Sequence, residues 1–278
     1  MDVQSRFTWI DIEICLLLAV VTLLPYLQTF TFGFVNIDDP GYVYENSLIK
    51  SGLTRESISQ ATFGFHQSNW HPLVWISYMV EVEIFGINPG IMHTTNVILH
   101  VMKSLILYWW LRLATTDVIR SFLAALLFAI HPAHVESVAW ITERKDVLST
   151  LFLLITLVGY TRYCQSVGKI WYIASLIAFA LGLTAKGMLV TVPLVLLVLL
   201  LIDIWPLNRL ERDSTFSNIL LSLRRLTIEK LPFFMLSAAV CVITIAARRV
   251  AELCEDFRNS QLLSDWQTRW SVALGIAL

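Results

Sequence analysis

The sequence predicts an all-α membrane protein, a multi-pass helical bundle. Hydrophobic residues make up 56% of the 278 positions, and charged residues make up 15%, well below the roughly 25% of a soluble domain. The apolar residues form runs that approach the length of about 20 residues needed to cross a bilayer. The formal net charge of -1 excludes the basic field that nucleic-acid binding requires. We therefore expect the lipid bilayer, and no nucleic acid, as a partner.

Apolar runs predict about seven complete transmembrane helices, near 12–32, 94–113, 118–131, 147–163, 170–185, 188–205 and 231–247. The run 172–202 would reach about 46 Å as one helix, too long for a core of roughly 30 Å, so we divide it at Lys186-Gly187. The first run contains Pro25 and has no small-residue cleavage signal, which predicts an uncleaved span. The run that begins at Trp270 predicts a truncated eighth helix at the end of the chain.

We interpret residues 1–278 as a single transmembrane domain whose connection over 33–93 is much longer than the others. Residues 53–61 follow Thr54, a typical N-cap, and predict a short surface helix. The segment 70–85 mixes aromatic rings with acids, which favours a helix in the interface plane that covers the site. Lysines and arginines are nearly balanced between the two sides. Placing the basic 206–230 loop in the cytoplasm makes 33–93 extracytoplasmic.

Two adjacent carboxylates, Asp38 and Asp39, come directly after the first predicted crossing. A partly dry setting there would raise the pKa of a carboxyl group and allow it to act as a base. The alternative is an ordinary turn, because Asp39-Pro40-Gly41 is also a common turn sequence. These two aspartates are the candidate catalytic residues.

A second polar group, at 131–149, separates the apolar runs 118–130 and 147–163. Ionisable side chains are costly in hydrocarbon, so this group is expected at a membrane boundary or along a cavity. The alternative is a connector whose charges simply face water. Lys186 is predicted on the same side, where it could bind an anion such as phosphate or extend to the interface. The candidate substrate- or phosphate-binding residues are His131, His134, Glu136, Arg144, Lys145 and Lys186.

The spacing His131-x-x-His134-x-Glu136 raises the possibility of a divalent cation, although Pro132 interrupts a regular helix face. His93, Asn96 and His100 share one face of a helix and are expected to hold helices together rather than to touch substrate. Lys103 lies within a predicted span and has to pair, face the interior or extend to the interface. We find no Walker motif, no nucleophile elbow and no tetratricopeptide repeat in the sequence.

Several longer motifs over roughly 12–210 resemble the membrane region of the transmembrane and tetratricopeptide repeat-containing O-mannosyltransferases and their bacterial relatives, within the GT-C glycosyltransferase superfamily. The similar stretches are Asp38 to Tyr42 with Glu45-Asn46, Asn69 to Leu73, Phe85 to Gly90, His93 with Asn96 and His100, His131 to Ser149, and Gly182 to Pro193. The tetratricopeptide repeats of that family are absent from this chain.

The resemblance implies transfer of a sugar from a polyprenyl-phosphate carrier to an acceptor hydroxyl on a protein or glycan, on the extracytoplasmic face. In a bacterium this would be the periplasmic face of the inner membrane. Asp38 or Asp39 would accept the proton, and the histidines and basic residues of the second group would offset charge on the departing phosphate. His71 and His93 would support the site residues without contacting the substrate directly. The alternative is a non-catalytic membrane scaffold or a truncated, inactive fragment of such an enzyme.

Overall fold

The computed structural model describes residues 8–273, apart from 68, 167, 187–200, 202, 204, 206, 208 and 210–215. In this part of the chain the regular elements are helices, and no β-strand is present. Among the described residues, four segments are long and apolar enough to cross a membrane: Trp9–Thr31, Pro89–Thr115, Ile141–Gln165 and Leu221–Leu253. The chain is an integral membrane protein with the predicted all-α, multi-pass fold.

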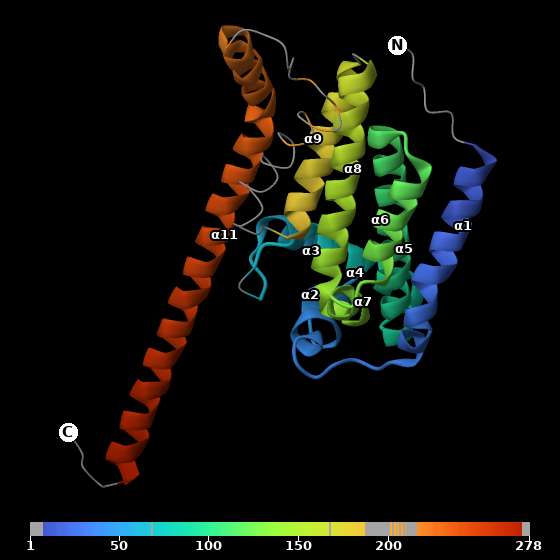
Figure 1. Ribbon diagram of the computed structural model, residues 1–278. Helices are drawn as coiled ribbons and strands as arrows, with labels where there is room; N and C mark the ends of the chain where they lie inside the picture. Colours follow the sequence, from blue (N-terminus) through green and yellow to red (C-terminus); the bar gives the residue numbers. More distant parts are fainter. Residues whose placement is uncertain are drawn as a thin grey trace.

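The bundle consists of α1 (Trp9–Leu23) with its extension η1 (Leu24–Thr31), α5 (Pro89–Thr115), α6 (Val118–Ile130), α8 (Arg144–Ser166) and α9 (Lys169–Ala185) (Figure 1). The α-helix α1 gives way to a 3-10 turn at Pro25, whose ring removes a backbone donor. α8 packs against both α5 and α9. Gly159 permits the close approach of α9, because a Cβ atom there would lie 3.0 Å from Ser175 Cβ.

Six of the seven predicted crossings lie on helices, and most of the seventh, 188–205, lies outside the described residues. Of the six, α6 and α9 are apolar but have only 13 and 17 residues. The last helix, α11 (Phe216–Ala273), has 58 residues and contains the predicted span 231–247. Residues 270–273 continue α11 without a break, so this stretch does not begin a separate helix. The count of seven stays a prediction.

The long connection over 33–93 is folded onto one end of the bundle (Figure 1). It contains η2 (Pro40–Tyr44), α2 (Ser47–Lys50), α3 (Arg55–Phe63) and α4 (Pro72–Phe85). The predicted cap is present, since the Thr54 side chain accepts a hydrogen bond from the Ser57 amide at 3.0 Å. α4 buries Trp75, Tyr78 and Met79 completely in one core with residues of η2, α8 and α9. This core fixes the connection to the bundle.

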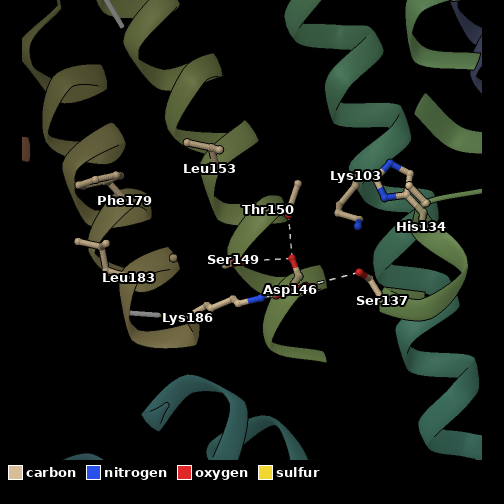
Figure 2. A pocket seen from close by; sticks show the side chains of 12 residues that line it. Lys103, His134, Ser137, Asp146, Ser149, Thr150, Leu153, Phe179, Leu183 and Lys186 are labelled. Carbon is tan, nitrogen blue, oxygen red and sulfur yellow. Dashed lines mark hydrogen bonds and ion pairs between the residues drawn. The ribbon is translucent and has the colours of Figure 1, made fainter. Parts of the chain in front are cut away.

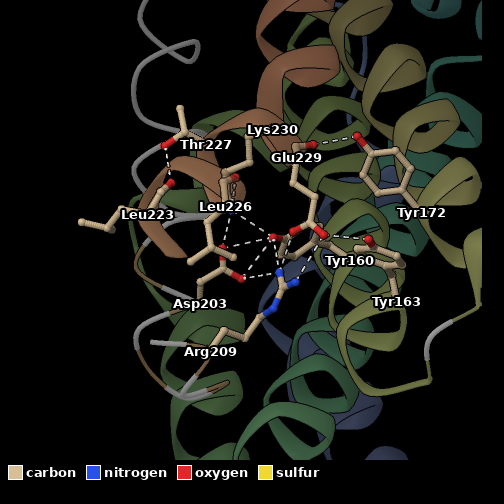
Figure 3. A network of polar contacts seen from close by, with 10 residues as sticks. All are labelled: Tyr160, Tyr163, Tyr172, Asp203, Arg209, Leu223, Leu226, Thr227, Glu229 and Lys230. Carbon is tan, nitrogen blue, oxygen red and sulfur yellow. Dashed lines mark hydrogen bonds and ion pairs between the residues drawn. The ribbon is translucent and has the colours of Figure 1, made fainter. Parts of the chain in front are cut away.

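A polar network joins α8 to α11 near the end of α8 that lies away from the 33–93 connection (Figure 3). Asp203 is fully buried and pairs with Lys230, and both groups contact the Tyr160 hydroxyl. Arg209 bridges Asp203 and Glu229 at 3.2 and 2.8 Å. Asp203 and Arg209 thus supply charges to a network that attaches α11.

Candidate functional site

The acidic pair lies between η1 and η2, at the end of the bundle that carries α2 and α7 (His134–Ala139) (Figure 1). Asp39 is fully buried, and its Oδ2 atom accepts a hydrogen bond from the Val35 amide at 2.6 Å. Its other oxygen, Oδ1, has no hydrogen-bond partner among the described residues. Asp38 is partly exposed. The two adjacent carboxylates therefore differ sharply in their access to water.

Burial raises the pKa of the Asp39 carboxyl group, because the charged form loses its hydration. The Val35 amide, the nearby Trp140 indole and His93 oppose this shift, whereas the neighbouring charge of Asp38 adds to it. Burial dominates, so the pKa lies above the ordinary value of 3.8. A carboxylate with a raised pKa and a free oxygen has the properties of a proton acceptor.

Tyr42 of η2 connects the acidic pair to the 131–149 group. Its ring stacks on Trp75 with centroids 5.0 Å apart, and the Lys145 ammonium lies 5.4 Å from its centroid. The pKa of the buried Tyr42 hydroxyl is raised by burial, lowered by Lys145 and raised by Asp38, so both charges lie near this ring. Lys145 also forms an ion pair with Glu143 at 2.9 Å. The acidic pair and Lys145 thus lie at the same end of the bundle.

Arg144 has a different environment from Lys145. Its side chain is completely buried and forms an ion pair with Glu81 of α4 at 2.6 Å. The same guanidinium group donates hydrogen bonds to Asn96 Oδ1 and the Met92 carbonyl, and it lies 4.4 Å from the Tyr78 ring centroid. Through these contacts the guanidinium meets Glu81 and Tyr78 of α4 and Asn96 and Met92 of α5. The prediction that Arg144 binds a substrate phosphate is not supported by its position, which suits holding α4, α5 and α8 together.

A pocket of about 410 Å³ lies between α5, α7, α8 and α9 (Figure 2). We refer to it as the inter-helix pocket. Its polar lining includes His134 and an ion pair between Lys186 and Asp146. Its apolar wall includes Leu153, Phe179 and Leu183. The volume falls in the range of small-molecule sites, and the mixture of charge and hydrocarbon suits an anionic group with an apolar tail.

The remaining predicted residues surround this region without lining the pocket. His131 and Glu136 are exposed on the connector between α6 and α8. His71 is buried, and its pKa is lowered to about 4 by burial and by the charges of Lys145 and Lys186, so its ring is neutral at neutral pH. His93 and Asn96 contact backbone carbonyls of Gly33 and Trp140, at 3.3 and 3.0 Å. His93, Asn96 and His100 therefore hold neighbouring segments, as their shared face predicts.

The hypothesis of a divalent cation at His131-x-x-His134-x-Glu136 gains no support from the arrangement of side chains. The rings of His131 and His134 lie with centroids 6.3 Å apart, and Glu136 is exposed to solvent. Among the described residues, no three His, Cys, Asp or Glu side chains form a group that could hold a metal ion. We therefore assign no step to a metal.

Asp146 and Lys103 line the inter-helix pocket but are not among the sequence-based candidates. Asp146 is part of the 131–149 group, yet nothing in the sequence indicates that it pairs with Lys186, 40 positions away. The position of Lys103 can be noted in the sequence, because a lysine within an apolar run has to face the protein interior or the interface. Only the fold shows that it faces this pocket.

Three curated proteins show what the chain is similar to. It is 34% identical over 155 residues to protein O-mannosyl-transferase TMTC1 of Mus musculus, a match that covers 52% of this chain and 16% of that protein. It is 32% identical over 153 residues to TMTC2 of Homo sapiens, covering 53% and 18%. With TMTC3 of Homo sapiens the identity is 30% over 158 residues, covering 54% and 17%.

The chain is similar in sequence to protein O-mannosyl-transferases at about 30% identity. The similarity extends over about half of this chain and less than a fifth of each of these relatives. No protein-family model and no solved structure matches the chain. The names of these relatives describe protein O-mannosyl transfer.

Proposed function

We propose that this protein is a membrane glycosyltransferase of the GT-C type, which transfers a sugar from a polyprenyl-phosphate carrier to a hydroxyl group of a protein or glycan acceptor. We place the site on the extracytoplasmic face, which in a bacterium is the periplasmic side of the inner membrane. One observation carries the proposal: a buried aspartate with a raised pKa lies at the same end of the bundle as a pocket that combines lysines with an apolar wall.

In the proposed reaction the acceptor hydroxyl oxygen attacks the anomeric carbon of the sugar. The bond between that carbon and the phosphate oxygen breaks, and the lipid phosphate leaves with the electron pair. Asp39 accepts the hydroxyl proton, since its free Oδ1 oxygen and raised pKa suit a base better than the partly exposed Asp38 does. Asp38 keeps local negative charge next to Asp39 and raises the pKa of Asp39.

The departing phosphate gains negative charge that nearby cations can offset. Lys186 lines the inter-helix pocket beside the neutral ring of His134, whose N–H can donate to a phosphate oxygen, and Lys145 lies 5.4 Å from the Tyr42 ring centroid. His131 and Glu136 lie on the exposed connector beside the pocket, where the acceptor could contact them. Arg144, His71 and His93 support the surrounding structure from buried positions.

The apolar wall of the inter-helix pocket accounts for the lipid part of the donor. Leu153 of α8 faces Phe179 and Leu183 of α9 across the pocket (Figure 2). Burying isoprenoid hydrocarbon against such side chains contributes about 25 cal/mol per Å² of apolar surface. A polyprenyl chain could therefore bind in the inter-helix pocket along the apolar side chains of α8 and α9, with its phosphate at the polar lining.

The experiment compares Asp39→Asn and Asp38→Asn in the full chain, in membranes supplied with labelled polyprenyl-phosphate sugars. Losing a general base costs a factor of about 10² to 10⁴, so we expect Asp39→Asn to reduce transfer by at least about 100-fold and Asp38→Asn to reduce it less. Asp117→Asn is the matched control, because Asp117 caps α6 at the other end of the bundle and asparagine caps equally well. Normal transfer by Asp39→Asn, with all variants equally abundant in the membrane, would refute Asp39 as the base, and no transfer by the unaltered chain would refute the proposed function.

A further inference from the structure

Lys103 is a buried lysine in the middle of α5, within the membrane-spanning segment. Its side chain is 1% exposed and lies along the inter-helix pocket beside His134 (Figure 2). Among the described residues, no carboxylate lies within ion-pair distance of its ammonium group, whose identified contact is the Phe128 ring at 5.7 Å. A buried ammonium without a direct ion-pair partner is costly, so this position favours a ligand that supplies negative charge.

The other charged groups of the pocket do not balance Lys103. Asp146 forms an ion pair with Lys186, and its charge also acts on Lys103, so a single carboxylate serves two lysines. Burial, assisted by the charges of Lys103 and His131, lowers the pKa of His134, so the ring of His134 is neutral at neutral pH. Two lysines and one aspartate leave the pocket with one net positive charge. One singly charged anion would neutralise it.

We propose that Lys103 binds a phosphate group in the inter-helix pocket, and that Asp146, by pairing with Lys186, restricts the pocket to a singly charged phosphate. This inference rests on the proposed function and identifies two further residues of its donor site. A sugar linked to a lipid through one phosphate is a phosphodiester with a single negative charge. A pyrophosphate-linked lipid carries more charge, and the described lining of the pocket has no second unpaired cation to meet it.

The surroundings of Lys103 fit such a group. Ser137 of α7 and Ser149 and Thr150 of α8 line the same pocket, where their hydroxyls donate to the carboxylate or the backbone carbonyl of Asp146. Serine and threonine hydroxyls can rotate from such contacts to donate to phosphate oxygens. The apolar side chains of α8 and α9 are next to these hydroxyls, so headgroup and hydrocarbon would each meet a matching surface.

The test measures binding to the purified full chain in detergent, with no transfer reaction needed. The probes are farnesyl methyl phosphate, a singly charged phosphodiester, and farnesyl pyrophosphate; farnesol and inorganic phosphate report the separate contributions of hydrocarbon and free anion. We expect Lys103→Gln to weaken phosphodiester binding at least tenfold, and Lys103→Arg to retain most of it. Lys169→Gln, an exposed lysine at the other end of α9, is the matched control and should bind normally.

Asp146→Asn tests selectivity independently. It frees Lys186 and raises the net charge of the pocket, so the preference should shift toward farnesyl pyrophosphate by at least tenfold. Phosphodiester binding that is unchanged in Lys103→Gln, or a preference that is unchanged in Asp146→Asn, overturns the inference. If Lys103→Gln does not fold, the Asp146→Asn ratio decides the question. Lysine-dependent binding without any transfer would leave this inference intact and refute the proposed function, and normal transfer by Lys103→Gln would do the reverse.

Discussion

Arg144 offers the clearest way to separate a structural charge from a substrate-binding one. Its neighbour Lys145 has the same charge, but Arg144 is completely buried and contacts Glu81, Asn96 and the Met92 carbonyl. Replacing Arg144 with methionine would leave the buried Glu81 carboxylate without its cation. Removing one partner of such a pair costs about 3–5 kcal/mol, so we expect Arg144→Met to lose stability by this amount.

The measurement is a double-mutant cycle in detergent, with unfolding followed for Arg144→Met, Glu81→Leu and the double variant. Residues in direct contact show interaction energies of about 0.5–3 kcal/mol in such cycles. We therefore expect the double variant to be more stable than the sum of the two single losses predicts. Additive losses, or an Arg144→Met variant that keeps its stability and yet loses lipid-phosphate binding, would refute the structural role and return Arg144 to the phosphate site.

The remaining predictions concern the base, the helix contacts and the distal network. Because burial raises the pKa of Asp39 above 3.8, kcat/KM should fall as the pH decreases through a midpoint above that value; an ordinary midpoint would contradict the role of Asp39. Since folding raises this pKa, protonating Asp39 at low pH stabilises the fold, so the activity loss should precede unfolding in a parallel melting series. Gly159→Leu should separate α8 from α9 and cost about 1–3 kcal/mol, because even a Cβ atom lies 3.0 Å from Ser175; an unchanged unfolding midpoint would be the contrary result. Asp203→Ala removes the ion-pair partner of the buried Lys230 and should lower the free energy of unfolding by about 3–5 kcal/mol. A decrease below about 1 kcal/mol would show that the network does not hold α11.

The sequence predicts the helices of the bundle well, because crossing a bilayer demands long apolar runs. The start of α3 behind Thr54 and the shared face of His93, Asn96 and His100 are also predictable, since both depend on local spacing along one helix. The lengths of α6 and α9 and the continuity of α11 depend on tertiary packing. Apolar runs alone do not determine them.

The candidate site is only partly predictable, because tertiary packing decides which charged side chains meet. Composition indicates that Arg144, Lys145 and Lys186 need partners, but it cannot assign them. Arg144 pairs with Glu81, on a helix from the long connection, and Lys186 pairs with Asp146 across α8 and α9. These contacts join distant parts of the sequence, and they decide which cation is structural and which one lines a pocket.

The central claim is that the acidic pair and the inter-helix pocket open to the same, extracytoplasmic side of the membrane. Single cysteines introduced into a cysteine-free background test it directly, at Ile37 beside the acidic pair, Val135 beside the pocket and Lys169 at the other end of the bundle. All three positions are exposed. In intact cells a membrane-impermeant maleimide should label Ile37→Cys and Val135→Cys, whereas Lys169→Cys should be labelled only after permeabilisation. Labelling of Ile37→Cys and Val135→Cys from opposite sides would contradict the account.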